Sequence, residues 1–298
     1  MTIRVARPDD AAEVVALRAL VFPYLVRGVA STRKMIAEPP PGEEWTAFVV
    51  EVDGAVVGWV SAYRDVQTSE VGAGEVALLH VHPGHRGRGV GSALLAAALG
   101  HLTPLGIRRL LGSARPEGLP FARRHGFTAG REMRYSALEL HSPPPPPAAA
   151  PGLRLTPLSG LDPYEVYLAN RAAAVDEPGD VPRDVLTYET FRHDVWENLG
   201  LDREASTAVE SGGKVLAFSL VKRDGDRMWS DYTGTVPQHR GQGLARLAKV
   251  AALHRAAGRG VRVAYTSNDA ANAPMLAINA ALGYRPVVSH WSCLRELG

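Results

Sequence analysis

The chain has 298 residues, of which 46% are hydrophobic, enough for the core of one large domain or two ordinary ones. Its 33 basic and 31 acidic residues nearly cancel, so the composition offers no general attraction to nucleic acid or to an anionic membrane. A single cysteine, Cys293, excludes an intrachain disulfide and a multi-cysteine metal site, and the opening residues carry no apolar signal core. We therefore expect a cytoplasmic protein with neither nucleic-acid nor membrane partners.

The first half of the sequence predicts a mixed α/β unit. Residues 46–65 alternate in the manner of a strand and contain Asp53-Gly54, a pair typical of a tight hairpin turn. Residues 74–81 form an apolar, buried strand that leads directly into a glycine-rich loop. The other expected elements are strands at 3–8, 107–114 and 131–140, and helices at 11–22, 89–102 and 119–126.

The second half repeats this order after a break. Five consecutive prolines between His141 and Gly152 predict an extended linker or, alternatively, a surface loop. Arg86 and Arg240 are 154 residues apart, and Gly126 and Gly283 are 157 apart, as a duplicated domain predicts. Expected strands lie at 153–158, 206–224, 228–236, 261–268 and 285–294, and helices at 243–258 and 273–283. The fold class is α/β with mixed sheets, and the domains are 1–140 and 153–298, joined by a proline-rich linker at 141–152.

Two related stretches stand between an apolar strand and a helix: VHPGHRGRGVGSALL, from Val81 to Leu95, and TVPQHRGQGLARLAK, from Thr235 to Lys249. A glycine-rich turn before a helix presents unpaired backbone amides and the positive end of the helix dipole, which suits a diphosphate. Arg86 and Arg240 can add charge-assisted hydrogen bonds. An ordinary tight turn is the alternative, and duplication argues against it. Neither loop fits the Walker or the dinucleotide motif, so ATP and NAD lack motif support.

Both halves resemble the GNAT superfamily of coenzyme A-dependent N-acetyltransferases. The signature [RQ]-x-x-G-x-[GA] is met by Arg86, Gly89 and Gly91, and again by Arg240, Gly243 and Ala245. A later N-x-x-A/P…G-[FY] segment matches residues 272–284, whereas the first half has Arg115 in place of the asparagine. The tandem arrangement resembles actinobacterial two-domain acetyltransferases.

The resemblance implies acetyl-CoA as co-substrate, held between two splayed strands, and direct attack by an amine. Three histidines, His80, His82 and His85, lack a carboxylate or cysteine to complete a ligand set, so we expect no metal. The expected cofactor-binding residues are Leu79, Val81, Arg86, Gly87, Arg88, Gly89, Val90 and Gly91 in the first half, and Thr233, Thr235, Arg240, Gly241, Gln242, Gly243, Leu244, Ala245, Asn272 and Asn279 in the second.

Catalytic residues are less well marked than the loops. Glu75 matches the position at which many family members carry a catalytic glutamate, while Trp229 takes that position in the second half and Asp231 lies two residues further on. Solvated strand ends are the alternative for both carboxylates. The tyrosine that often protonates the departing thiolate is replaced by Ala122 and Asn279.

A contrast in charge slightly favours the C-terminal half as the active one. Residues 176–204, which would cover its acceptor site, hold nine acidic side chains against three arginines and would attract a cationic amine. The sequence thus predicts an N-acetyltransferase, monomeric or homodimeric, that acts on a primary amine of a small cationic molecule. A non-catalytic coenzyme A sensor and a protein N-terminal or lysine acetyltransferase remain as alternatives.

Overall fold

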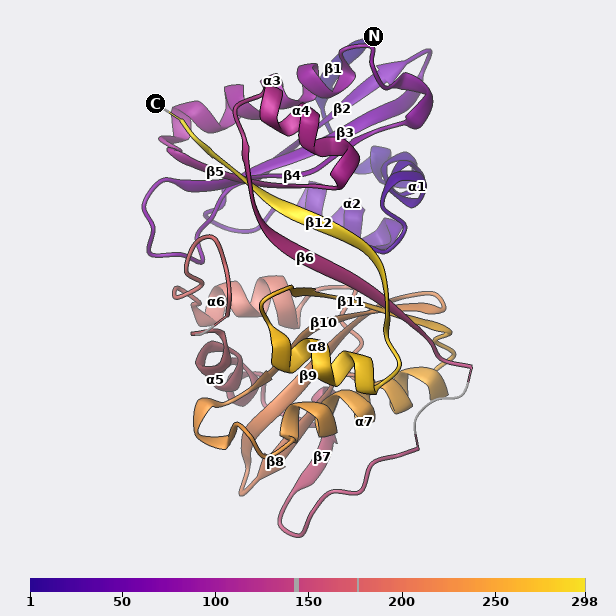
Figure 1. The fold of residues 1–298 in the computed structure, drawn as a ribbon, viewed down its shortest axis with the longest axis vertical. Coiled ribbons are helices and arrows are strands. Elements are labelled where there is room, and N and C mark those ends of the chain that lie inside the picture. Colours follow the sequence, from indigo (N-terminus) through magenta and orange to yellow (C-terminus); the bar gives the residue numbers. More distant parts are fainter. Residues whose placement is uncertain (142–144, 176, 298) are drawn as a thin grey trace. The chain divides into compact units, whose positions relative to one another are not determined.

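The structure, a computed structural model, describes residues 1–141, 145–175 and 177–297. Part of the expected linker, Ser142–Pro144, therefore lies outside the described residues, as does Asp176. The chain divides into two compact units, Met1–Met133 with Ser289–Gly298, and Arg134–Val288 (Figure 1). No helix of the described chain combines the length and the apolar character needed to cross a membrane.

The first unit is built on a mixed sheet. Its strands β1 to β4 pair antiparallel in chain order, β4 pairs parallel with β5, and β5 pairs antiparallel with β12. The expected hairpin at Asp53-Gly54 is confirmed, with φ angles of 52° and 80° at the two turn residues. The strands are β1 (Thr2–Val5), β2 (Thr46–Val52), β3 (Ala55–Arg64), β4 (Ala73–Val81), β5 (Arg109–Ala114), β6 (Thr128–Glu139) and β12 (Arg285–Glu296).

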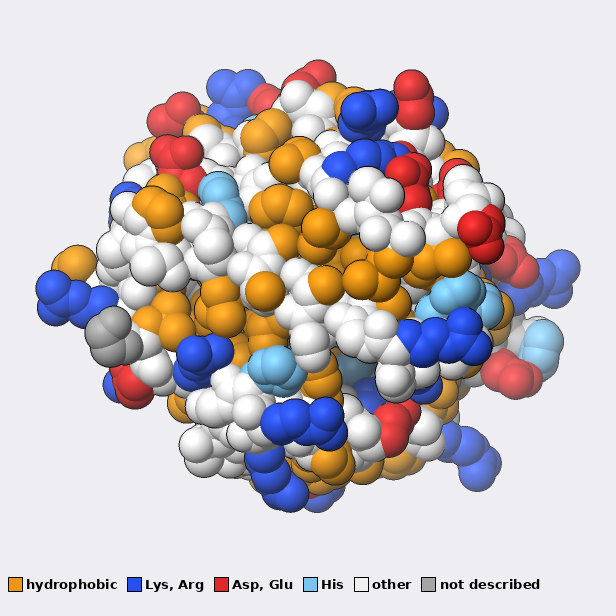
Figure 2. Space-filling view, turned by 90° about the horizontal axis from the view of Figure 1, so that it is seen from above, with side chains coloured by type: hydrophobic (Ala, Val, Ile, Leu, Met, Phe, Trp, Pro, Cys, Tyr) orange, Lys and Arg blue, Asp and Glu red, His pale blue; other side chains and the backbone are white. Residues whose placement is uncertain are grey.

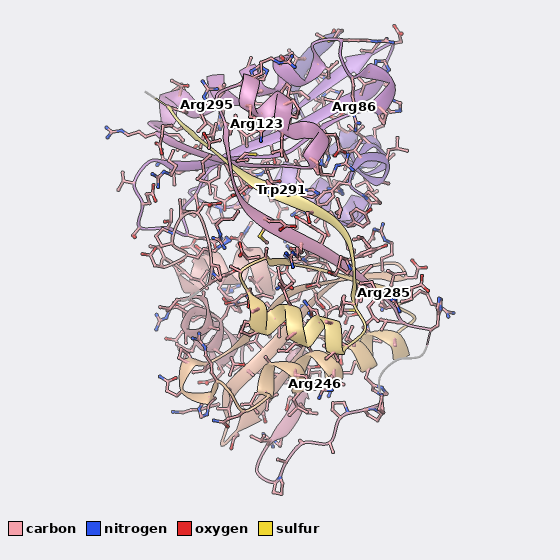
Figure 3. The ribbon with its side chains drawn as sticks, viewed as in Figure 1. Arg86, Arg123, Arg246, Arg285, Trp291 and Arg295 are labelled. Atoms are coloured by element: carbon pink, nitrogen blue, oxygen red, sulfur yellow. The ribbon has the colours of Figure 1, made fainter. Side chains whose placement is uncertain are left out.

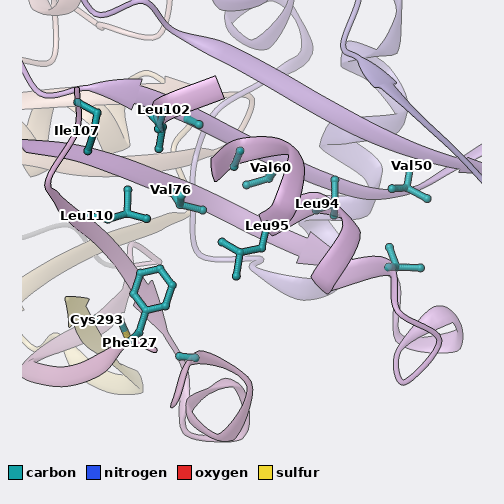
Figure 4. Packing of buried hydrophobic residues seen from close by; sticks show 14 of the residues in the cluster. Val50, Val60, Val76, Leu94, Leu95, Leu102, Ile107, Leu110, Phe127 and Cys293 are labelled. Carbon is teal, nitrogen blue, oxygen red and sulfur yellow. The ribbon is translucent and has the colours of Figure 1, made fainter. Parts of the chain in front are cut away.

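Helices cover both faces of this sheet. Strand residues alternate between faces, so that Val49 and Trp59 pack with helix α1 while Val50 and Val60 pack with helix α3. Figure 4 shows the cluster on the α3 side, where Phe127 and Cys293 join the strand and helix residues. Each fully buried valine or leucine contributes about 1.5–3 kcal/mol of hydrophobic stabilisation. The helices are α1 (Ala11–Val21), α2 (Val29–Ala37), α3 (Val90–Leu102) and α4 (Leu119–Arg124).

The second unit repeats this plan. Strands β7 to β10 pair antiparallel in chain order, and β10 pairs parallel with β11. Asp162 begins helix α5 by accepting a hydrogen bond from the Tyr164 amide, with Pro163 at the first helical position. The elements are β7 (Arg154–Pro157), β8 (Thr207–Ser211), β9 (Lys214–Asp224), β10 (Arg227–Thr235), β11 (Val263–Asp269), α5 (Pro163–Ala174), α6 (Tyr188–Phe191), α7 (Leu244–Gly258) and α8 (Ala273–Ala281).

Strand register confirms the duplication position by position. Ala73 pairs with Arg109 in the first unit, and Arg227 pairs with Val263 in the second, so both partners are displaced by 154 residues. The α4 and α8 segments are related by the second spacing, 157 residues. The amide of Phe127 bonds to the carbonyl of Ala122, and the equivalent amide of Tyr284 bonds to the carbonyl of Asn279. Residues of the two units can therefore be compared one by one.

The end of β12, the last strand, belongs to the first unit. Residues 291–296 of β12 pair with β5, whereas the division expected from sequence assigned them to the second half. In turn, residues 134–139 of β6 belong to the second unit, where β6 neighbours β11. Both β6 and β12 have twelve residues, twice the length of β5, so each is long enough to contribute one end to each unit.

Charge on the surface is mixed. Acidic and basic side chains are interspersed around exposed hydrophobic ones on the face shown in Figure 2. This distribution is consistent with the near balance of charges in the sequence.

Candidate functional site: a cleft between splayed strands

The first glycine-rich loop has the backbone form that an anion site requires. After β4 the chain makes a short turn at Pro83–His85, and Gly87 and Gly89 then adopt φ angles of 73° and 82°. Gly89 directly precedes α3, whose first amides have no partner within the helix. A side chain at either glycine would be strained by the positive φ, although nothing lies within 4 Å of an added Cβ. The loop is therefore open on the side from which a phosphate would approach.

The second loop has the same geometry. Gly241 and Gly243 both have φ angles of 76°, and Gly243 directly precedes α7. In each loop the arginine side chain bonds back to the preceding strand: Arg86 Nε donates to the Val81 carbonyl at 3.3 Å, and Arg240 Nε donates to that of Thr235 at 3.4 Å. Figure 3 labels Arg86, and Arg246 on α7.

Beside the first loop, two parallel strands separate. Pairing of β4 with β5 covers only residues 73–75 and 109–111. Beyond it, Leu78 has a φ of 54°, and the register between β3 and β4 shifts opposite Trp59 and Ser61. A cavity of about 540 Å³ lies here, within the usual range for ligand sites. Its walls come from β4, the glycine loop, α3, the end of β5, α4 and β12.

This cavity reaches both faces of the sheet. Leu95 and Phe121 line it from the side of α3 and α4, and Val21 and Phe22 line it from the end of α1. Six of the residues predicted for the cofactor in the first half line it together, and they are Leu79, Val81, Arg86, Gly87, Gly89 and Gly91. The other two do not: Arg88 is exposed, and Val90, the first residue of α3, is buried in the core.

Glu75 lies at the last position of β4 that pairs with β5, opposite Leu111. Its carboxylate accepts a hydrogen bond from the Tyr63 hydroxyl. It is not among the residues that line the cavity. The sequence motif therefore brings this carboxylate to the same strand as the cavity, but not to its wall.

Two histidines lie in the cavity wall; from sequence, His80 was considered only as a possible metal ligand and His290 was not singled out. His80 on β4 and His290 on β12 both line it, and both rings contact Phe22, at centroid distances of 6.0 and 4.9 Å. Burial, with smaller contributions from Arg18 and Arg115, lowers the pKa of His80 to about 3. Burial also lowers the pKa of His290 to about 4, an effect that Arg115 reinforces and Glu117 opposes. Both imidazoles are neutral at pH 7.

The corresponding positions of the second unit are buried and polar. Where the first unit has Val76, Leu95 and Phe127, the second has Ser230, Lys249 and Tyr284. The Ser230 and Tyr284 hydroxyls are 3.2 Å apart, and Lys249 Nζ lies 5.0 Å from the centre of the tyrosine ring. Lys249 is only 1% exposed, and burial lowers its pKa to about 7.

Other predicted residues of the second half are engaged in local hydrogen bonds. Asn272 accepts from the Met275 amide at 3.2 Å and so caps α8, while Asn279 Nδ2 donates to Asn268 Oδ1 at 2.6 Å. The Thr233 hydroxyl is 2.9 Å from that of Ser219. Gln242, Gly243 and Leu244 line a second cavity of about 530 Å³ together with the described linker residues Pro145–Pro147.

The acidic residues of the second half are partly neutralised. Asp231 is paired with Lys222 at 2.8 Å, so this predicted catalytic carboxylate lies in an ion pair. In the acidic stretch, Arg192 is paired with Glu197, and Arg259 lies 3.0 Å from Asp202. The attraction for a cationic amine is therefore weaker than the count of acidic residues suggests.

Comparison with known proteins finds the same family twice. The model of the acetyltransferase (GNAT) family matches residues 17–127 and 172–284, and each match contains one glycine-rich loop. A mycothiol acetyltransferase of Nocardioides sp. is 31% identical over 222 residues, which cover 69% of this chain and 75% of that protein. Another, from Thermobispora bispora, is 25% identical over 295 residues, covering 95% and 96%.

Solved structures share the tandem fold. A tandem GNAT protein from the clavulanic acid biosynthesis pathway has a TM-score of 0.75 at 22% identity and covers 100% of this chain and 98% of its own. A GCN5-related N-acetyltransferase from Sphaerobacter thermophilus has a TM-score of 0.73 at 19% identity, with coverage of 99% and 95%. At these identities the likeness concerns the fold.

Proposed function

The chain belongs to the acetyltransferase (GNAT) family, and from this premise we propose that it transfers an acetyl group from acetyl-CoA to a primary amine of a small molecule. The curated relatives are named mycothiol acetyltransferases, after a small molecule, which supports a small-molecule substrate here. The reaction joins the amine nitrogen to the acyl carbon, breaks the carbon–sulfur bond and releases the thiol of coenzyme A.

We place this transfer in the first unit, although the sequence slightly favoured the C-terminal half. The observation that carries the proposal is the cavity that extends from the Arg86–Gly91 loop into the gap between β4 and β5. Its floor, with Val76, Leu95 and Phe127, is apolar and suits a pantetheine arm and an acetyl group. The matching floor of the second unit carries a buried lysine and two hydroxyls, which would lose hydrogen bonds or charge solvation against an apolar arm.

The first unit supplies the groups that such a reaction needs. The amides at the start of α3 and the Arg86 side chain would hold the diphosphate. Apolar walls would exclude water from the thioester. Phe22 and His80 line the cavity on the α1 side, and in this proposal the amine approaches from there, on the face opposite α3. Donor and acceptor would thus meet through the gap in the sheet.

The second unit is the alternative site of transfer. Its loop repeats the geometry of the first, and the family match extends over it. Asp231, despite its pairing with Lys222, would be the carboxylate nearest to the predicted catalytic position there. A cationic acceptor would favour this unit, because acidic side chains such as Glu189 and Glu204 lie in the stretch that would cover it.

Matched substitutions in the two loops test the assignment. Gly89→Asp would place a carboxylate against the diphosphate in the first unit, and Gly243→Asp would do the same in the second. Gly89→Asn is the control, because asparagine tolerates the same backbone conformation without adding charge. The measurements are calorimetry with coenzyme A and thiol release from acetyl-CoA with polyamines, aminoglycosides, amino acids and aminosugars.

We expect Gly89→Asp to abolish thiol release and Gly89→Asn and Gly243→Asp to retain it. The reverse pattern would move the reaction to the second unit. If the protein binds coenzyme A but releases no thiol from acetyl-CoA with any of these amines, a non-catalytic sensor would be favoured instead.

A further inference from the structure

Within the first cleft, we propose that His290, carried by the last strand of the chain, accepts the proton that the acceptor nitrogen loses, and that His80 orients this nitrogen. The proposal rests on the proposed function, since it assigns the proton transfer of that reaction. It differs from the glutamate expected from sequence, and it makes the C-terminal segment part of the first unit's chemistry.

The position of the two rings supports this assignment. His80 stands opposite Trp59 in the β3–β4 pairing, on the face that α1 covers. His290 lies one residue before Trp291, which pairs with Ala114 at the end of β5 (Figure 3 labels Trp291). The two imidazoles are thus carried by the two sides of the splay, β4 and the β5–β12 pair, and both line the cavity between them.

A general base is needed on the α1 side of the cavity, from which the acceptor amine approaches in the proposed function. Phe22, at the end of α1, contacts both imidazole rings, so the three rings form the wall of the cavity on that side. An amine that enters here meets the thioester across the gap in the sheet, with the imidazole nitrogens as its polar neighbours. Glu75 does not line the cavity, and its carboxylate already binds the Tyr63 hydroxyl.

Burial and nearby charges determine the protonation state of the His80 and His290 imidazoles before reaction. Burial is the main cause of the low pKa of both rings. Arg18, Arg115 and Arg86 further lower the pKa of His80, whereas at His290 Arg115 lowers the pKa and Glu117 raises it. Glu117 is paired with Arg115 at 2.7 Å. Both rings are therefore neutral before reaction, so that a ring nitrogen can accept a proton. Of the two, His290 has the nearby carboxylate that would stabilise its protonated form.

The balance of the step is simple. The acceptor nitrogen forms a bond to the acyl carbon, and the electron pair of the broken carbon–sulfur bond leaves on sulfur. The proton lost by nitrogen moves to the His290 imidazole and from there to the thiolate or to solvent, which regenerates the neutral ring. No oxidant, reductant or metal is required.

Matched histidine variants test the proposal. We expect His290→Gln to lower kcat by about 100-fold or more, as loss of a general base does, while the affinity for coenzyme A changes by less than about twofold. His80→Gln should mainly raise the KM of the amine. His101→Gln is the control, because this histidine lies on α3 and bonds to the Glu44 carbonyl, away from the cavity. Melting temperature shows whether each variant folds.

Two further measurements separate proton transfer from a structural role. Imidazole added to His290→Ala should restore part of the turnover, because a free base can then occupy the space of the ring. In the wild-type protein without substrate, NMR should show His290 neutral at pH 7, as its pKa of about 4 requires.

Wild-type kcat in folded His290→Gln, absence of rescue by imidazole, or a charged His290 at pH 7 would each overturn the assignment. None of these outcomes would affect the transfer itself, which fails only if the wild-type protein releases no thiol.

Discussion

One position of the duplicated fold shows how far the two units have diverged. Leu95 and Lys249 occupy equivalent sites on α3 and α7, and Leu95 lines the first cavity. Packing at this site does not need a charge, since leucine fills it in the first unit. A buried ammonium is unfavourable because it loses its hydration, and the contact with the Tyr284 ring compensates only in part.

Lys249→Met should therefore stabilise the protein in a pH-dependent way. Burial lowers the pKa of Lys249 from 10.5 to about 7, so the unfolded chain binds more protons between these values. The wild-type free energy of unfolding then rises as pH increases through this window, and the cost of the lysine is complete below pH 7. We expect a gain on the order of 3 kcal/mol at pH 7 that shrinks towards pH 10.

Urea unfolding at several pH values measures this difference. The control is Lys214→Met, at the exposed start of β9. Parallel pH profiles for wild type and Lys249→Met would contradict the prediction.

At the scale of elements, the close packing of α3 on its sheet depends on a glycine, Gly58. A Cβ at Gly58 on β3 would lie 2.9 Å from both Leu94 Cδ1 and Val90 Cγ1 on the helix. Both helix residues are buried, at 0% and 2% exposure, so neither has space to move. This close approach holds the start of α3, and with it the glycine loop, near the end of β4.

Gly58→Ala should accordingly push α3 outward and destabilise the first unit by about 1–3 kcal/mol through overpacking. Coenzyme A affinity should fall with it, because the loop amides move with the helix. Gly100→Ala is the matched control on the same helix, where an added Cβ meets nothing within 4 Å and helix propensity predicts a gain of about 0.5–1 kcal/mol. Thermal unfolding and calorimetry measure both effects. Equal stability of the two variants would show that the contact is not limiting.

At the scale of the whole molecule, the two structural units do not correspond to two continuous halves of the sequence. Residues 289–298 complete the first unit, where Trp291 pairs with Ala114 and Cys293 is buried at 2% exposure in the core. The end of the chain therefore stabilises its beginning.

Truncation after Val288 tests this arrangement. The first unit should lose the partner of β5, so amides of residues 109–114 should exchange hydrogen much faster, whereas those of β8 (Thr207–Ser211) should be little changed. Hydrogen exchange followed by mass spectrometry distinguishes the two. Faster exchange confined to the second unit would contradict the prediction.

Local signals were enough to predict most of the fold and the two loops. The hairpin at Asp53-Gly54, the strand from 74 to 81 and the glycine turns depend on a few adjacent residues, and the structure confirms them. Family resemblance named Leu79 and Arg86 for the cofactor, and both line the cavity, but their binding of coenzyme A stays a prediction.

The walls of the site could not be predicted in this way. His290 reaches the first cavity only because β12 contributes its end to that unit, and no local pattern reports such an exchange. Lys249 lies in an apolar helical stretch, so periodicity places it inward without revealing what it meets. Spacing placed Glu75 on the correct strand but could not tell which side chains line the gap.

The exchanged strand also sets an order of events during biosynthesis. While the ribosome is still translating the second unit, the edge of β5 has no neighbour on one side, and an open strand edge is prone to pair with other chains. Only after residues 291–296 emerge from the exit tunnel can they pair with β5 and complete the sheet of the first unit. The first cleft can therefore be completed only after the second unit has been synthesised, however early its own glycine loop is made.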